Sequence, residues 1–571
     1  MPNTMSRRAF FGLKEALTQA EELPLRGVMS GLDPYVGTFK DAEIYHLLRR
    51  TMFGVTPDDV AVFKSMTPSQ AVDFLLQTTT APAPPVNNYS IAYKDYEGTN
   101  DQDKKLVDKT IAPNDKYVKL GDTFINANFD LEVEYYRSMA LKGWWLDSVI
   151  HQTPSIHEKM TFFWTNHIPI QMFLVYDARF SYKYLMTLRN NALGNFRTIV
   201  KEMTIDPAML FYLNGTYNEK NAPDENYGRE LQELFCVGKG SGSKYTEDDV
   251  KAAARVLTGW KSEYNKPNTY FQANVHDDKD KQFSAFYNNT VIKGKTGDDG
   301  KKELDEMLDM IFAANETAKH LCRKLYRYFV YSQIDDTTEQ IIITPLADLL
   351  RKSNYDVKPV LAKLLKSQHF FDVLNQGAML KTPLEYVVGL CRNFKVKFPA
   401  KTDYANHHNT YASLYYWTSD MLQAIGDPPN VAGWPAWYQK PALDRFWINT
   451  ASLPKRAQNA DTMLYWGYGT WFIHEGGIDV FNFTKTLKDP STPSGLIDEM
   501  TARMSILPLA PEIKTNLKNI LTYNQAQDYY WTNGWNEYLA APNDEMKKNN
   551  IKWRLIDFYR YLFQLEEYQL I

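Results

Sequence analysis

The chain has 571 residues, enough to bury a large hydrophobic core without the help of a disulfide or a metal. It carries 64 Lys and Arg against 68 Asp and Glu, a net charge of -4, and this near balance argues against a general nucleic-acid binder and a membrane-surface binder. With 44% apolar and 23% charged residues, the composition is globular, which excludes a chain that is disordered, collagenous or coiled-coil throughout.

The three cysteines, Cys236, Cys322 and Cys391, lie far apart in the sequence. An odd and sparse set is not a disulfide framework, and none of the spacings is that of a metal-binding pair. The pattern suits a reducing compartment. No stretch reaches about 18 consecutive apolar residues, so the sequence predicts no transmembrane helix.

Near the N-terminus, the pair Arg7 and Arg8 resembles the twin-arginine motif of an export signal. The apolar segment of such a signal is missing, because residues 12–22 are rich in charged and amide side chains. We therefore predict an N-terminal arm or short amphipathic helix within residues 1–40, and a cytoplasmic protein.

Apolar residues recur at helical spacing along most of the chain, beginning with a helix predicted at 41–52. In that helix Ile44, Leu47 and Leu48 share the buried face. His46 and Arg50 fall on the opposite side. Further helices are expected over 57–65, 68–78, 132–150, 154–167, 178–203, 224–237, 246–259, 303–313, 315–331, 337–352, 357–366, 383–394, 409–424 and 543–566.

Strand-like alternation is scarce and short, so the sequence predicts an all-α protein: one large multi-helix globular fold with few or no strands. Long irregular loops are expected at 79–130 and 261–302. We expect residues 41–460 to form the helical core and residues 461–571 to form a helical extension packed on it.

The helix at 154–167 places a histidine on its buried face. Its apolar stripe contains Met160, Phe163 and Trp164, and His167 falls at the centre of that stripe, at the C-terminal end of the helix. A core histidine held by the backbone and the helix dipole explains this position. A metal ligand or a general base would also stand there.

The helix at 224–237 carries two carboxylates three residues apart. Glu230 lies at the border of the buried face and Glu233 farther out. Side chains with this spacing can converge on one metal ion or share a proton. A solvated polar face that includes Arg229 is the alternative interpretation.

Two further histidine positions lie in predicted loops. His276 precedes Asp277 in the second long loop, which would deliver both side chains to a site or simply leave them in a hydrophilic surface loop. His407 and His408 form a loop pair with no obvious partner.

Two other groups are interpreted as structural. Arg323, Lys324 and Arg327 follow one another on a long helix and indicate a mostly solvated face. Trp434 and Trp437 lie in a rigid proline-rich turn, where packing is favoured over stacking on a sugar. The sequence has no P-loop, no GxGxxG after a strand, no GxSxG and no HExxH, which disfavours phosphoryl transfer from nucleotides, nicotinamide chemistry and α/β-hydrolase chemistry.

Four motifs together resemble a known bacterial family, that of domain of unknown function 1800. They are HLLRRxxFG at 46–54, FWxxH at 163–167, ENYxRELxEL at 225–234 and YTxxDVxxxARxLTGW at 245–260. Later blocks match in order as far as about residue 450. The resemblance implies a mainly helical bacterial protein whose relatives are often exported, and it names no activity. A cell-envelope or periplasmic location and a sulfatase-like partner protein are therefore expected by family analogy.

The resemblance also singles out the polar residues of the recurring motifs as candidates. Our first hypothesis is a metal-dependent enzyme, a hydrolase, in which His167, Glu230 and His276 bind Zn, Fe or Mn. Glu233 would be a further ligand or the general base, and Arg229 would stabilise an anionic intermediate. The abundance of aromatic residues suggests a glycan or cell-envelope substrate. An oxidative reaction at non-haem iron is a variant of this hypothesis.

The second hypothesis is non-catalytic: a helical scaffold or partner-binding protein of the bacterial envelope. In that case the motifs form a buried polar network, since buried Arg, Glu and His side chains often satisfy one another without a metal. Geometry distinguishes the two hypotheses. A metal site needs His167, Glu230 and His276 within bonding distance of one point.

Overall fold

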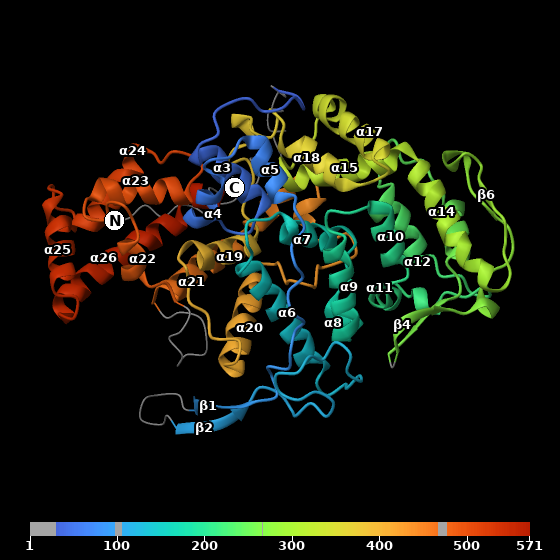
Figure 1. Ribbon diagram of the computed structural model, residues 1–571, viewed down its shortest axis with the longest axis horizontal. Coiled ribbons are helices and arrows are strands. Elements are labelled where there is room, and N and C mark those ends of the chain that lie inside the picture. The colour runs from blue at the N-terminus through green and yellow to red at the C-terminus, as the bar shows by residue number, and fades with distance from the viewer. Residues whose placement is uncertain (1–29, 98–104, 265, 466–476) are drawn as a thin grey trace, which may run out of the picture.

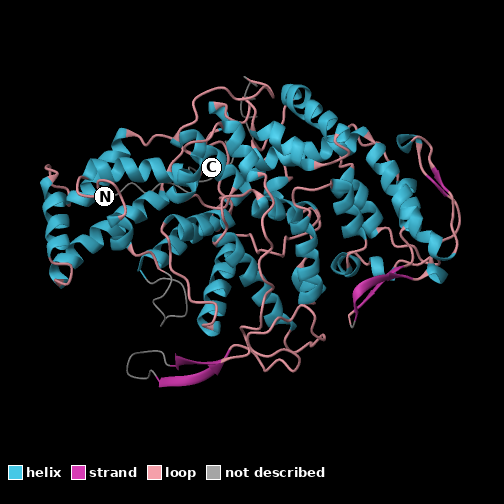
Figure 2. Ribbon diagram, in the orientation of Figure 1, coloured by secondary structure: helices cyan, strands magenta, loops and turns pink. Residues whose placement is uncertain are grey.

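The computed structural model describes residues 30–97, 105–264, 266–465 and 477–571. The predicted arm therefore lies mostly outside the described residues. Helices dominate, as the sequence predicted, and strands occur only at the margins (Figure 2). The described strands form three two-stranded antiparallel sheets: β1 (Ala92–Glu97) with β2 (Lys105–Thr110), β3 (Trp260–Glu263) with β4 (Lys266–Phe271), and β5 (Lys281–Gln282) with β6 (Val291–Ile292). Apart from Trp260 at the start of β3, all six strands lie within the two segments predicted as irregular loops.

The first half of the chain builds the middle of the molecule (Figure 1). Its helices are α3 (Asp41–Thr51), α4 (Pro57–Phe63), α5 (Pro68–Leu75), α6 (Glu134–Ile150), α7 (His157–His167), α8 (Met172–Val175), α9 (Ala178–Asn190), α10 (Phe196–Thr204) and α11 (Pro207–Tyr212). Several begin at side-chain caps, as α9 does at Asp177, whose carboxylate accepts from two backbone N–H groups.

The next helices extend to one end of the molecule, where α14 and β6 lie (Figure 1). They are α12 (Asn226–Glu230), α13 (Glu247–Val256), α14 (Lys302–Ala313), α15 (Asn315–Phe329), α16 (Asp336–Thr338), α17 (Thr344–Lys352) and α18 (Val357–Leu365). Two short π-helices interrupt this series, Leu231–Cys236 directly after α12 and Glu339–Ile343 directly after α16. Such wider turns are rare and often mark functional positions.

The last helices run from the middle of the molecule, where α19 and α20 lie, to the opposite end, which α22 to α26 form (Figure 1). They are α19 (Pro383–Asn393), α20 (Tyr404–Asp420), α21 (Ser452–Tyr465), α22 (Val480–Lys485), α23 (Pro493–Met504), α24 (Pro511–Thr522), α25 (Tyr529–Ala540) and α26 (Glu545–Gln564). The ring of Phe394 packs against that of Phe563 with centroids 5.2 Å apart, and Leu380 pairs with Leu570 through the backbone. The C-terminal helices therefore share one hydrophobic core with the rest of the chain.

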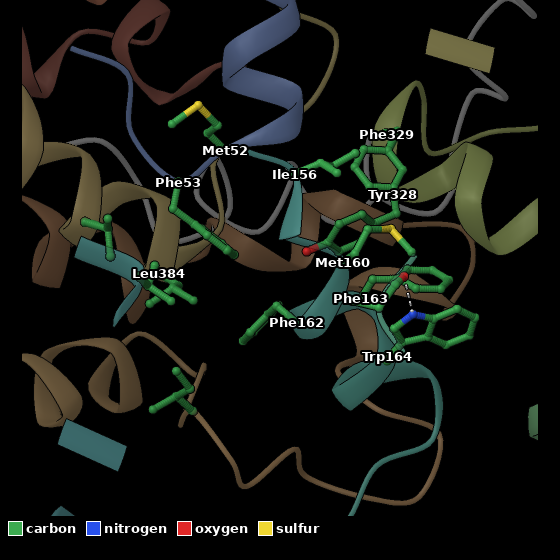
Figure 3. Close-up of a cluster of buried hydrophobic side chains, with 14 of the residues drawn as sticks. Met52, Phe53, Ile156, Met160, Phe162, Phe163, Trp164, Tyr328, Phe329 and Leu384 are labelled. Atoms are coloured by element: carbon green, nitrogen blue, oxygen red, sulfur yellow. Dashed lines mark hydrogen bonds between the residues drawn. The ribbon is translucent and has the colours of Figure 1, made fainter. Parts of the chain in front are cut away.

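Helix α7 lies at the centre of the core and is buried along its whole length. Figure 3 shows its aromatic residues among side chains of α15 and α19 and of Met52 and Phe53, which directly follow α3. Phe163 packs edge-on against Tyr328, with ring centroids 5.3 Å apart, and Trp164 is fully buried with its indole N–H donated to Ala192 O at 3.0 Å. Trp434 and Trp437 are also buried, in agreement with the packing interpretation of their turn.

Two side chains on the side of α3 opposite its apolar stripe are also buried. His46 and Arg50 are each 1% exposed, although they lie opposite the apolar stripe of α3. A ring nitrogen of His46 lies 2.9 Å from Phe370 O, and Arg50 donates to Asn375 O at 2.7 Å. The segment 366–380 covers this side of α3, so the helix is buried on two sides.

Several predicted elements differ in their boundaries. The helix expected over 178–203 is divided into α9 and α10, and Asn195 begins the second by accepting from Thr198 N. The helix expected over 224–237 changes from α to π after Glu230. Helix α20 begins at Tyr404, so His407 and His408 lie on a helix and are buried, not in a loop.

Candidate functional site

His276 lies in a closed polar network beside α13 and α14. Its ring Nδ1 is 2.9 Å from Thr258 O, and Nε2 is 3.2 Å from Glu303 Oε1, close enough for an ion pair although not aligned for a hydrogen bond. Glu303 is fully buried and also pairs with the buried Lys281 at 2.5 Å. The backbone N–H of Lys295 donates to the same carboxylate at 2.7 Å.

The electrostatics of this network favour an ionised carboxylate. Burial alone would raise the pKa of Glu303, but the contacts from His276 and Lys281 outweigh it and hold the pKa below its ordinary value. The adjacent Asp277 pairs with Arg255 at 2.7 Å, and its pKa is lowered by that guanidinium despite partial burial. Both nitrogens of His276 therefore already face protein partners.

The predicted catalytic Arg229 belongs to a more exposed ion-pair group. It donates to Glu247 at 2.7 and 2.8 Å, and to Glu225, one turn earlier on the same helix, at 3.0 Å. These contacts raise the pKa of the guanidinium and lower that of Glu247. The group ties the start of α12 to the start of α13.

Glu230 and Glu233 stand beside each other where α12 becomes a π-helix. Glu230 is half-buried, and its pKa is raised by burial and then by the charge of Glu233. Glu233 pairs with Lys239. Burial and Glu230 together raise the pKa of Tyr212 to about 12. Repulsion between the two carboxylates is the feature that a bound cation would relieve.

His167 is 3% exposed at the end of α7, so it points inward as predicted. Neither ring nitrogen makes a hydrogen bond of ordinary geometry to the described residues, although the backbone of Phe235 in the π-helix lies nearby. The ring stacks on Phe163 with centroids 5.7 Å apart and lies 5.9 Å from the ring of His320. Burial, and then Lys324 and His320, hold its pKa far below the ordinary value.

The structure does not bring the three predicted metal ligands together. Among the residues it describes, no group of three or more His, Cys, Asp or Glu side chains is arranged to hold a metal ion. His167 has aromatic rings and another histidine around it, Glu230 has a second carboxylate, and His276 is held by Thr258 and Glu303. The polar motif residues therefore form separate groups.

A cationic face on α15 was not anticipated as a site. Arg323, Lys324 and Arg327 are only partly exposed, against the expectation of a solvated face. Arg323 pairs with Glu316 at 2.9 Å and with Glu339, in the second π-helix, at 2.6 Å. Burial and the charge of Arg327 lower the pKa of Lys324 to about 8. A buried amine with a perturbed pKa is a signal that only the folded chain reveals.

A cavity of about 550 Å³ at the C-terminal end of α6 was also not anticipated. His151 and Asp147 line it, with His151 Nδ1 2.8 Å from Asp147 Oδ1. Burial would raise the pKa of Asp147, but contacts from His151, Lys401 and Tyr411 lower it instead. An ionised carboxylate that fixes one imidazole nitrogen leaves the other available as a base.

The three cysteines are free and buried, as their spacing predicted. Within the described ranges, no helix combines the length and the apolar character that crossing a membrane requires.

Comparison with known proteins identifies a family. The sequence model of a family described as protein of unknown function (DUF1800) matches residues 46–570, which includes the C-terminal helices α22 to α26. No curated protein and no solved structure matches the chain. The chain therefore belongs to the DUF1800 family, in agreement with the resemblance of its four motifs.

Proposed function

We propose that this member of the DUF1800 family is a non-catalytic helical scaffold that binds a partner, and that its polar motif residues stabilise helix packing. The observation that carries the proposal is the network of His276, Glu303 and Lys281, in which each polar group faces another and almost nothing reaches solvent. A buried ion pair that lacked one member would leave a charge stranded, so all members are needed for folding.

Other motif residues support the same role. Asn166, within the FWxxH motif, accepts from the backbone N–H of Trp434 at 3.0 Å and so fixes the proline-rich turn against α7. Arg229 connects α12 to Glu247 of α13. Arg255 in the following motif holds Asp277. These contacts join segments that are distant in the sequence.

The partner and the compartment of this proposal rest on the family resemblance alone. We propose a sulfatase-like partner in the cell envelope. Affinity purification of the full chain from its own host, with crosslinking and mass spectrometry, tests this part. Recovery of a sulfatase-like protein supports it, whereas its absence from the crosslinked material contradicts it.

A metal-dependent hydrolase is the second candidate, and the paired Glu230 and Glu233 favour it. A divalent cation at these carboxylates would relieve the repulsion that raises the pKa of Glu230. The metal hypothesis adds His167 and His276 as ligands. His276 would have to break its contacts with Thr258 and Glu303 to reach an ion at Glu230 and Glu233.

A metal-free hydrolase would use a different place, the cavity beside α6. His151, oriented by Asp147, would act there as a general base on water. Assays of the full chain with nitrophenyl esters, phosphates, sulfates and glycosides test this candidate. Turnover that is lost in His151→Gln and kept in His407→Gln supports it, and equal rates in the two variants contradict it.

Unfolding measurements test the scaffold proposal. His276→Gln and Glu303→Gln are compared with Asp298→Asn, which alters an exposed carboxylate in the same region. We expect Glu303→Gln, which strands the charge of Lys281, to lose about 3–5 kcal/mol of unfolding free energy. His276→Gln leaves the pair of Lys281 with Glu303 intact and should lose about 1–3 kcal/mol for the polar groups that it leaves unsatisfied. The exposed variant should lose less than about 1 kcal/mol. A His276→Gln variant of native stability that has lost a bound metal would favour the hydrolase.

A further inference from the structure

We infer that Lys324 and Arg327 of α15, together with His167 of α7, bind the oxyanion group of an acidic ligand, either a carboxylate or a phosphate or sulfate ester. This inference concerns a site that the scaffold proposal does not use. Three observations support it. Lys324 and Arg327 carry positive charges without an ion pair in the described residues, they lie on one face of α15, and the nitrogens of the buried His167 make no hydrogen bond of ordinary geometry to those residues.

The charges on this part of α15 do not balance. The two nearby carboxylates, Glu316 and Glu339, are both bound by Arg323. Lys324 and Arg327 make no ion pair or hydrogen bond to any residue in the described ranges, and Arg327 Nε is buried without a partner. Both side chains are only partly exposed, so an anion that paired with them would offset the hydration they have lost.

The cations also lie close together on the helix. At about 100° per residue, His320, Lys324 and Arg327 lie within about 60° of one another, on successive turns of one face. Burial and Lys324 lower the pKa of His320 to about 3, so the ring is neutral. An ammonium and a guanidinium on adjacent turns are a common arrangement for binding an anion with several oxygens.

The two π-helices hold the flanks of this face. Leu234 O, in the first π-helix, accepts from His320 Nε2 at 2.9 Å. Glu339, in the second, holds Arg323. The neighbouring polar groups are thereby fixed. The N–H groups of Lys324 and Arg327, which lie between them, stay available to a ligand. A preorganised pair of this kind loses little entropy when it binds a ligand.

His167 supplies the independent observation. It is 3% exposed, its ring is 5.9 Å from that of His320, and neither nitrogen makes a hydrogen bond of ordinary geometry to the described residues, although the backbone of Phe235 approaches the ring. Buried polar atoms are nearly always satisfied, so an unsatisfied imidazole indicates a missing partner. A neutral imidazole can donate one N–H to an anion, whereas a metal cation would be repelled by Lys324 and Arg327.

Titration calorimetry of the full chain tests the inference. The probes are inorganic phosphate, sulfate, acetate and citrate, each against sodium chloride at the same ionic strength. We expect saturable binding of at least one probe, weakened about tenfold or more in Lys324→Gln and in Arg327→Gln, since each loses a charge-assisted bond. Lys319→Gln, on another face of α15, is the matched control and should change affinity less than about twofold.

The identity of the probe distinguishes the sources of the anion. Binding of acetate or citrate alone assigns a carboxylate ligand, and binding of phosphate or sulfate alone assigns an ester of those acids. Either result supports the site. The absence of saturable binding by all four probes, or equal weakening by Lys319→Gln, overturns it.

A second measurement uses only the native protein, in case the variants do not fold. Limited acetylation with an amine reagent is followed by mass spectrometry of peptides containing Lys319 and Lys324. We expect the probe that binds to slow modification of Lys324 several-fold and to leave Lys319 unchanged. Equal rates at both lysines, with and without the probe, contradict the inference.

Discussion

Replacing Glu303 with Gln removes one charge from the His276 network and keeps the shape of the side chain. In the native protein this carboxylate is fully buried, pairs with Lys281 at 2.5 Å and accepts from Lys295 N at 2.7 Å. The amide of Gln can keep one hydrogen bond, but it leaves the ammonium of Lys281 without a counter-charge. No cavity is created, so the effect reports on charge alone.

The expected loss is about 3–5 kcal/mol of unfolding free energy, the usual cost of breaking a buried ion pair by removing one partner. The exposed pair of Glu306 with Lys295 supplies the matched control, because Glu306→Gln should cost less than about 1 kcal/mol. Replacing both Lys281 and Glu303 with Met should recover much of the loss, since the stranded charge is then absent.

The acid dependence of stability gives a second readout of the same change. The pKa of Glu303 is below 4.5 in the folded protein, so its contribution is present above the unfolded value of 4.5 and is lost as the pH falls through the folded value. We expect Glu303→Gln to remove that part of the acid sensitivity.

Urea denaturation followed by circular dichroism at pH 7 and pH 4 measures all of these variants. A loss of less than about 1 kcal/mol in Glu303→Gln would refute the reasoning. Strict additivity of single Met replacements at Lys281 and Glu303 would refute it as well, because coupled residues deviate from additivity.

Three further predictions concern the centre of the molecule. The pKa of Lys324 is about 8 in the folded protein and 10.5 in the unfolded chain, so the free energy of unfolding should rise with pH between these two values, by less than about 3 kcal/mol. In urea melts over a series of pH values, Lys324→Met should abolish this rise. Trp164→Ala should cost about 3–5 kcal/mol through the cavity it leaves, against an unchanged melting temperature for the exposed Trp553→Ala. Gly238→Ala should cost about 1–2 kcal/mol of unfolding free energy, because the φ of Gly238 is 83° and the added Cβ would also press on the ring of His320. Gly240→Ala is the control, because its added Cβ meets only open space.

The helical fold could be predicted from the sequence because most helices have one clear apolar stripe. In helix α7 the spacing placed Phe163 and His167 inside, and both are buried, although every other residue of that helix is buried as well. Helix α3 shows the limit of this reasoning. The side of α3 that carries His46 is covered by the segment around Phe370, more than 300 residues later in the chain. No local sequence pattern reveals that contact.

The site was less predictable because it depends on which residues meet. The sequence placed His276 in a loop, at a site or on the surface, but it could not reveal that its partner Glu303 lies on α14. The change from α to π after Glu230 has no recognised sequence signal, and it alters which carbonyls are left for His320 and His167. Lys324 resembled an ordinary charged residue, because the burial that perturbs it arises only in the folded chain.

The most direct test of the scaffold account is the metal content of the purified full chain after incubation with Zn, Fe(II) and Mn and removal of excess ion. The account predicts much less than one ion per chain, with no difference between the native protein and folded Glu230→Ala or His167→Ala variants. One tightly held ion per chain in the native protein, lost in both variants while they stay folded, would contradict it and make the metal-dependent hydrolase the better explanation.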